Sequence, residues 1–303
     1  MLKNYFKIAI AVLKRRKFFT FISLFGISFT LTILIVAAAF EEKLVGENYP
    51  ELNRERSLYI NFVQEQNSKY LYTRNGPASY YFLDHYVNTL KTPEKVAIGS
   101  LFTPVNTYVN NKKLVINIKY TNEGWWDVLQ YQFIEGKPYT QQQIDNGEHV
   151  AVISEDLKKD YFGDESNVVG KYIEADNVQY RVAGVVKSVA VTMLDSYADL
   201  FAPYTISKTD YRKKDINGNY AAIILARSKT DLPKIQQEYA NVISKVPTDD
   251  KQFDILKSSA DSYLVSFMTM NIKSSAGLII TTVIALFVLF IMLLPTLNLV
   301  NIN

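Results

Sequence analysis

The chain has 303 residues, of which 48% are hydrophobic and 21% charged, and it contains no cysteine. Residues 41–275 carry 27 basic and 30 acidic side chains, so this part is slightly acidic and lacks the basic surface that a nucleic-acid partner requires. The absence of cysteine excludes disulfides, zinc-thiolate sites and thiol catalysis.

The first 17 residues are predicted to form a cytoplasmic amphipathic helix. Their apolar side chains recur every three or four positions, which places one set on a single helix face: Leu2, Tyr5, Phe6, Ala9, Ile10 and Leu13. Such a helix suits the membrane surface, with its lysines near anionic lipid head groups, and it equally suits a cytoplasmic partner. The pattern leaves both interpretations open.

Two uncharged stretches predict transmembrane helices. Residues 18–40 are 23 residues without a charge, about 35 Å as a helix, and residues 276–296 include a run of 19 uncharged residues. The first stretch is too long for the apolar region of a signal peptide, which favours a span over a cleaved leader. The two spans would flank one large domain.

The basic residues before the first span set the expected topology. Lys14, Arg15, Arg16 and Lys17 predict a cytoplasmic N-terminus, because basic residues are retained on the cytoplasmic side. Residues 41–275 then form an extracytoplasmic domain. Residues 297–303 are interpreted as the start of a cytoplasmic segment at which the chain is truncated.

The domain between the spans is predicted to mix strands and helices. Alternation and β-branched residues predict strands at 113–119, 149–153, 180–186, 200–204 and 221–226. Helices are expected after Pro77, from Ser154 to a stop at Gly163, and over 231–246 with Pro233 in the first turn. The expected fold class is therefore an α+β extracytoplasmic domain flanked by two transmembrane α-helices.

In the strand at 113–119, Leu114, Ile116 and Ile118 alternate with Val115, Asn117 and Lys119, which is typical of a half-buried strand. The adjacent Trp125 and Trp126 fit aromatic core packing better than ligand stacking, since a large ring gains more from burial than from exposure.

No motif predicts a catalytic, cofactor or metal site. His85 and His149 are far apart and have no clustered ligand partners. The segment GDESNVVGKY at 163–172 departs from a phosphate-binding loop in its glycine spacing and in the tyrosine that replaces Ser or Thr. The spans contain no ionisable residue, so no proton or ion path is expected in the bilayer. We expect a protein that is not an enzyme.

Five segments resemble one protein family in order and spacing: GWWDVLQYQFIEGKPYT (124–140), HVAVISEDLKKDYFG (149–163), VVGKYI (168–173), VQYRVAGVV (178–186) and LFAPYT (200–205). They are similar to the periplasmic core domain of the MacB-like, FtsX-related ABC transporter permeases. The structural positions that carry the likeness are Gly124, Trp126, Gly136, Gly163, Gly170, Gly184 and Pro203. The resemblance implies two subdomains, with one inserted near residues 112–188.

The resemblance also implies a function. It suggests a non-catalytic permease subunit, multi-pass in the bacterial cytoplasmic (inner) membrane, that transmits ATPase-driven motion to its outer domain for export, efflux or lipoprotein release. The implied partners are a separate cytoplasmic ABC ATPase subunit, a second permease copy in a homo- or heterodimer, membrane lipid, and a periplasmic or outer-membrane protein. Family members continue into two further spans that this chain does not reach. Two alternatives stay open: a two-span sensor, and an FtsX-like scaffold that activates a cell-wall hydrolase.

Overall fold

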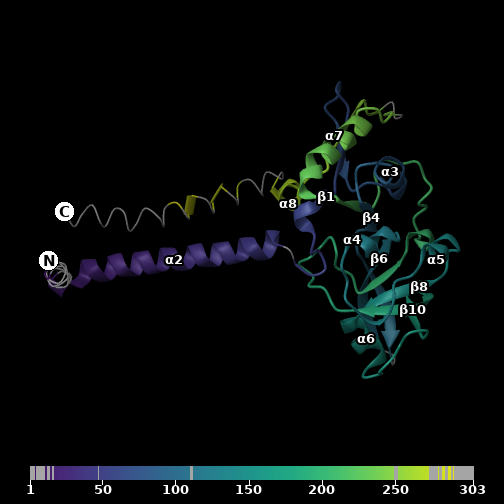
Figure 1. Cartoon of the computed structure of the whole chain (residues 1–303), viewed down its shortest axis with the longest axis horizontal. Helices are drawn as coiled ribbons and strands as arrows, with labels where there is room; N and C mark the ends of the chain where they lie inside the picture. Colours follow the sequence, from purple (N-terminus) through teal and green to yellow (C-terminus); the bar gives the residue numbers. More distant parts are fainter. Residues whose placement is uncertain are drawn as a thin grey trace. The chain divides into compact units, whose positions relative to one another are not determined.

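The computed structural model of the chain describes residues 4, 11, 14, 15, 17–46, 48–109, 112–248, 252–272, 279, 282, 283, 286, 287 and 289 (Figure 1). The chain divides into two units, residues 47–267 and the terminal parts 1–46 with 268–303. Each unit is described by itself.

The terminal unit contains one long apolar helix. α2 spans Lys17–Val45, and its stretch Thr20–Ala39 has a mean hydropathy of 2.3 with none of it buried. By length and composition this helix is able to cross a bilayer, as predicted for residues 18–40. It is the one such helix among the described residues. The predicted helix at 1–17 and the second span at 276–296 fall mostly outside the described residues, and 297–303 falls wholly outside them.

Residues 47–267 are built on a mixed sheet of ten strands. Its order is β1 (Ser57–Ile60), β12 (Tyr220–Leu225), β4 (Lys95–Ser100), β6 (Lys112–Thr121), β11 (Leu200–Pro203), β8 (Val150–Ser154), β10 (Val178–Val186) and β7 (Phe133–Gly136). β5 (Thr103–Val109) pairs with β6, and β9 (Tyr172–Ala175) pairs with β10. β11 is parallel to β6 and β10 is parallel to β8, while the other pairs are antiparallel.

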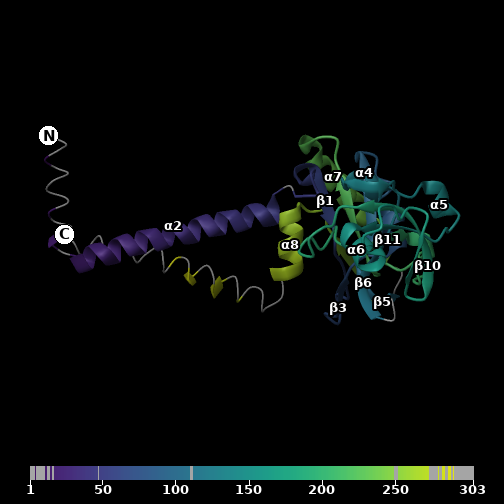
Figure 2. The same ribbon diagram turned by 90° about the horizontal axis from the view of Figure 1, so that it is seen from below.

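A second sheet has three strands in the order β13 (Ile255–Ser258), β2 (Val63–Gln66) and β3 (Thr73–Gly76). In Figure 2, β3 of this sheet and β5 of the large sheet project to the same side of the unit. The helices are α3 (Tyr80–Tyr86), α4 (Gly124–Val128), α5 (Gln141–Asp145), α6 (Glu155–Phe162), α7 (Leu232–Ile243) and α8 (Tyr263–Ile272). Short 3₁₀ helices occur at Arg54–Arg56, Tyr204–Ile206 and Lys229–Asp231. The structure thus confirms a mixture of helices and strands.

Side chains of the large sheet alternate between its two faces, and both faces carry buried cores. One face, with Tyr59 of β1 and Phe201 of β11, packs on α4 and its Trp125. The opposite face carries two separate cores. The first packs β1, β4 and β12 against α3 and α7, and the second packs β6, β8 and β10 against α6. Figure 1 shows α3 and α7 at one end of the unit and α6 at the other. An inserted subdomain at 112–188 remains a prediction.

Local sequence signals account for several boundaries. The Ser154 hydroxyl accepts a bond from the Leu157 amide at 3.1 Å and starts α6, which ends at Gly163 with φ +68°. Thr140 and Gln143 form a reciprocal capping box that starts α5. In α7, Pro233 lies in the first turn, where its missing N–H costs no helical bond. The helices and strands predicted between residues 41 and 275 all occur, with shifts of a few residues at their ends.

The structure corrects one expectation for β6. Ile116 and Ile118 are buried as predicted, but Lys119 on the alternate face is also buried, with only 1% of its surface exposed. The strand is therefore covered on both faces at this point. The aromatic prediction for Trp125 is confirmed, since this residue is 2% exposed in the core.

Candidate functional site

The described basic residues that were predicted to set the topology lie at the N-terminal end of the apolar helix α2. Lys14, Arg15 and Lys17 are exposed, and Arg16 falls outside the described residues. Lys17 is the first residue of α2.

Two of the positions that carry the family likeness bring strands unusually close together. Gly136 and Gly184 are register partners in β7 and β10. A Cβ at Gly136 would lie 2.2 Å from the carbonyl oxygen of Ala183, and one at Gly184 would lie 2.7 Å from that of Lys137. Contacts this short leave room only for glycine.

The other positions lie at turns and element ends. Gly124 begins α4, Gly163 follows α6, Gly170 lies in the turn before β9, and Pro203 ends β11. The structure spreads these residues through the domain as packing and turn positions and does not gather them into one site.

Trp126 packs in an aromatic group on one face of the large sheet. Its ring lies 5.4 Å from Tyr131, 5.6 Å from Phe133, 5.4 Å from Tyr139 and 5.5 Å from Phe201, measured between ring centroids. Three of these pairs are edge-to-face and the fourth is tilted, as aromatic cores prefer. Trp126 is half-buried and packs against the core that contains Trp125.

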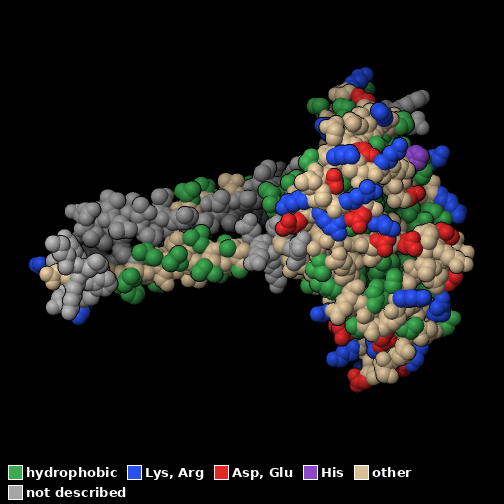
Figure 3. Space-filling view, in the orientation of Figure 1, with side chains coloured by type: hydrophobic (Ala, Val, Ile, Leu, Met, Phe, Trp, Pro, Cys, Tyr) green, Lys and Arg blue, Asp and Glu red, His purple; other side chains and the backbone are tan. Residues whose placement is uncertain are grey.

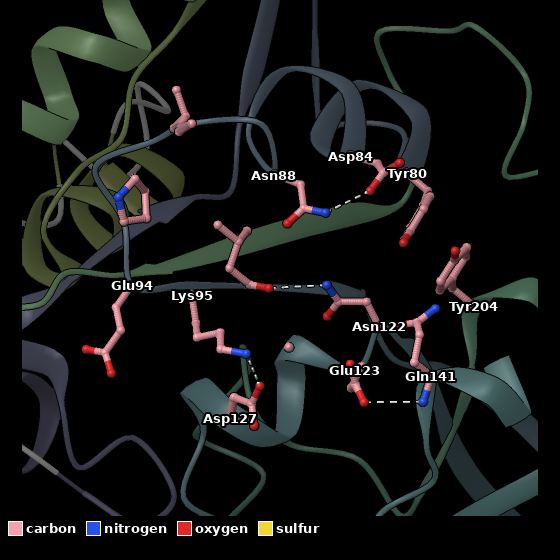
Figure 4. Close-up of a pocket in the computed structure, with 14 residues that line it drawn as sticks. Tyr80, Asp84, Asn88, Glu94, Lys95, Asn122, Glu123, Asp127, Gln141 and Tyr204 are labelled. Atoms are coloured by element: carbon pink, nitrogen blue, oxygen red, sulfur yellow. Dashed lines mark hydrogen bonds and ion pairs between the residues drawn. The ribbon is translucent and has the colours of Figure 1, made fainter. Parts of the chain in front are cut away.

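A polar cleft of about 420 Å³ opens between α3, β4 and α4 (Figure 4). Four carboxylates line it, Asp84, Glu94, Glu123 and Asp127, and its single basic residue, Lys95, is bound to Asp127 at 2.9 Å. A cleft with this excess of negative charge disfavours phosphate groups. Within the described residues, no group of three His, Cys, Asp or Glu side chains is arranged to hold a metal. His85 and His149 are both exposed.

On the face of residues 47–267 that Figure 3 shows, charges of the two signs are mixed. Figure 3 shows Lys and Arg interspersed with Asp and Glu on the visible face of residues 47–267. That face therefore offers no basic track for nucleic acid.

Four charged side chains meet inside the domain and form what we term the buried charge cluster: Glu51, Arg54, Lys119 and Asp195. Glu51 and Arg54 form an ion pair at 2.8 Å, and each side chain is only 2% exposed. Glu51 also accepts bonds from the Tyr59 hydroxyl at 3.0 Å and the Ser196 hydroxyl at 2.7 Å. The carboxylate is thus fully engaged, as a buried charge requires.

The rest of the cluster is held by the loop 187–199 between β10 and β11. The Lys119 ammonium donates to the main-chain carbonyl of Asp195 at 2.6 Å and contacts that of Leu194 at 3.5 Å. The Asn61 amide donates to the Asp195 carboxylate at 3.2 Å.

The cluster joins segments that are distant in sequence. Ser196 and Glu51 are 145 residues apart. The Arg54 guanidinium lies 3.7 Å from the centre of the Tyr263 ring, which stands at the first residue of α8. The first and last segments of residues 47–267 therefore meet at one buried polar contact.

Burial perturbs the titration of this cluster. It lowers the pKa of Lys119 to about 8, with Asp195 and Glu51 partly opposing the shift. It raises the pKa of Asp195 to about 6, an effect that Glu51 reinforces and Lys119 opposes. Asp195 is only half-buried when all its atoms are counted. Its carboxyl group, however, lies among buried side chains, and this explains why its pKa is raised. Burial and the Glu51 charge also hold the pKa of Tyr59 well above its usual value.

Sequence reasoning missed this cluster. No local pattern marks Glu51 or Arg54, and the alternation around Lys119 pointed to solvent. The carboxyl groups of Glu51 and Asp195 are far apart in the sequence, so their proximity in the fold leaves no periodic signal.

The family model of the MacB-like periplasmic core domain matches residues 20–242. The ABC transporter permease YknZ of Bacillus subtilis (strain 168) is 18% identical over 67% of this chain and 52% of its own length. The pyoverdine export ATP-binding/permease protein PvdT of Pseudomonas syringae pv. syringae (strain B728a) is 24% identical over 44% of this chain and 20% of its own length.

A solved domain of a permease protein from Porphyromonas gingivalis has the same fold, with a TM-score of 0.54 and 14% identity over 71% of this chain and 92% of that domain. The chain spans only about 20% to 52% of the length of these two curated relatives. The match to the family model covers most of the chain, from within α2 to the end of α7. The chain therefore belongs to the family of the MacB-like periplasmic core domain, found in ABC transporter permeases.

Proposed function

We propose that the protein is the permease subunit of an ABC-type transporter and passes ATPase-driven motion from the cytoplasm to an extracytoplasmic domain. The supporting observation is that one family match includes both the apolar helix α2 and the mixed domain behind it. The substrate would be exported or, for a lipoprotein, released from the membrane. Hydrolysis would occur on a separate cytoplasmic ATPase subunit.

The contacts of the domain suit a role in transmitting motion. The segment with Glu51 and Arg54 follows α2 after a few residues, and the last segment of the domain leads into α8. The buried charge cluster links these two segments to the central strand β6. A displacement of either segment would reach the sheet through buried ionic contacts. The expected assembly contains two permease copies, lipid around the spans, and a periplasmic or outer-membrane partner.

The first experiment is co-purification of the tagged full-length protein from its native membrane, followed by mass spectrometry. We expect a Walker-motif ATPase on a separate polypeptide. Recovery of a kinase or a cell-wall hydrolase without an ATPase would support the sensor or the scaffold instead. ATPase activity of the purified chain alone would contradict a separate ATPase, an arrangement to weigh because PvdT is named an ATP-binding/permease protein.

The cysteine-free sequence allows a direct test of topology. Asp164→Cys places a thiol on an exposed loop of the domain, and Lys14→Cys places one before α2. A membrane-impermeant maleimide should label Asp164→Cys in intact spheroplasts and Lys14→Cys only after lysis. The reverse pattern would overturn the orientation, and equal labelling of both before lysis would overturn the span itself.

A further inference from the structure

We propose that Asn61 and Asp195 form a proton-operated latch that holds the loop 187–199 against the domain, tight when Asp195 is protonated and looser when it is ionised. This inference concerns the domain alone and does not rest on the proposed transport function.

The loop is held by polar contacts centred on Asp195 and its neighbour Ser196. The Lys119 ammonium binds the Asp195 carbonyl, the Ser196 hydroxyl binds Glu51, and the Tyr131 hydroxyl donates to the Ser196 carbonyl. By contrast, the apolar side chains of Val191 and Leu194 are 59% and 51% exposed. A change in the charge of Asp195 therefore affects the contacts that hold the loop 187–199 against the domain.

The Asn61–Asp195 contact is only half complete. The Asn61 amide nitrogen donates to Asp195, but the amide oxygen of this 7% exposed residue is buried without a hydrogen-bond donor among the described residues. An ionised carboxylate has no proton to give, whereas a carboxylic acid has one. Protonated Asp195 would donate to the Asn61 amide oxygen while still accepting from the amide nitrogen. The acid and the amide would then exchange two hydrogen bonds.

The charged and titratable groups that face Asp195 come from every element packed around it. Glu51 and Arg54 lie on the first segment, Lys119 on β6, and two tyrosines on β1 and α8, Tyr59 and Tyr263. A cavity of only about 10 Å³ adjoins Asn61, Lys119 and Asp195, so little solvent screens these charges.

The sign of the pH effect follows from linkage. Burial and Glu51 raise the pKa of Asp195 from 3.8 to about 6 in the closed loop, whereas an opened loop would return the carboxyl group to water. Opening therefore releases a proton, and it becomes more favourable as the pH rises from about 4 to above 6. Lys119 stays protonated in both forms over this range, because its lowered pKa is still about 8. Between pH 5 and pH 7.5 the opening equilibrium should increase about tenfold.

The test is hydrogen–deuterium exchange of the full chain in lipid nanodiscs at pH 5 and pH 7.5, with exchange corrected for intrinsic rates. We expect about tenfold lower protection of peptides from 187–199 at pH 7.5, and no matching change in α6. Asp195→Asn, which cannot ionise, should remove the pH dependence. Asp164→Asn, at an exposed position, should leave it intact.

A second variant keeps the test decisive if Asp195→Asn fails to fold. Asn61→Ala removes the amide and should lower protection of the loop at pH 5 to near its pH 7.5 value. The latch would be refuted by loop protection that is constant or rises with pH in the unchanged protein. It would also be refuted if Asp195→Asn retained the tenfold change, or if α6 changed in parallel with the loop.

Discussion

Replacement of Arg54 with methionine tests how far the buried charge cluster stabilises residues 47–267. Methionine keeps much of the side-chain volume but removes the positive charge that faces Glu51 at 2.8 Å. Glu51 would remain buried, with only the hydroxyl groups of Tyr59 and Ser196 as partners. Removal of one partner of a buried ion pair costs about 3–5 kcal/mol, because the other charge is left without compensation.

For a domain of this size, such a loss corresponds to a decrease in the unfolding midpoint of about 6–20 °C. The assay is thermal unfolding of the full chain in detergent, followed by near-ultraviolet circular dichroism. This signal reports tertiary packing around the buried Trp125. The double variant Glu51→Gln with Arg54→Met should recover much of the loss, since neither charge remains buried alone.

The matched control is Lys95→Met, which breaks an ion pair of similar length, 2.9 Å, on the surface. Lys95 and Asp127 are 55% and 46% exposed, so we expect a cost below about 1 kcal/mol and a midpoint shift below about 4 °C. The reasoning fails if Arg54→Met lowers the midpoint no more than Lys95→Met does. It fails equally if the double variant is less stable than Arg54→Met.

Three further predictions are tested by the same unfolding measurements. Lys119 has a folded pKa of about 8 against an unfolded value of 10.5, so unfolding takes up a proton between these values. Stability should therefore rise with pH from about 8 towards 10, by up to about 3 kcal/mol, and Lys119→Met should remove this slope; an identical slope in the variant would refute the assignment. Gly136→Ala should lower the free energy of unfolding by about 2–5 kcal/mol, because φ is +61° and the new Cβ would overlap the Ala183 carbonyl. Its control Gly163→Ala, with no atom within 4 Å of the new Cβ, should lower it by only about 1–2 kcal/mol. Ser154→Ala should cost about 1 kcal/mol through loss of the α6 cap, and a larger loss would mean that the serine has another role.

Local signals predicted most of the elements. Ser154 and Gly163 marked both ends of α6. The apolar residues of β8 and β10 marked two strands, of which β8 is buried on both faces and β10 alternates before its buried C-terminal end. These features depend on backbone propensity, capping and periodicity, all of which are contained in a short window of sequence.

The environment of Lys119 could not be predicted in the same way. Alternation assigns Lys119 to the face opposite Ile118, but whether that face meets water depends on the loop 187–199, some 75 residues later. This loop has no periodic pattern of its own. A buried lysine is tolerated there because main-chain carbonyls of the loop accept its hydrogen bonds.

The pairing of β1 with β12 has a consequence for biogenesis. Arg56, just before β1, binds the carbonyl of Ala226, 170 residues later. Non-local strand pairs form slowly, because a long intervening chain must first be ordered. In the topology proposed above, residues 47–267 cross the membrane during synthesis, so β1 cannot pair until β12 has also crossed. The apolar side chains of β1, Leu58 and Ile60 among them, are buried in the folded domain but remain exposed until that pairing forms. In that topology, a chaperone outside the cytoplasm would bind this exposed apolar segment.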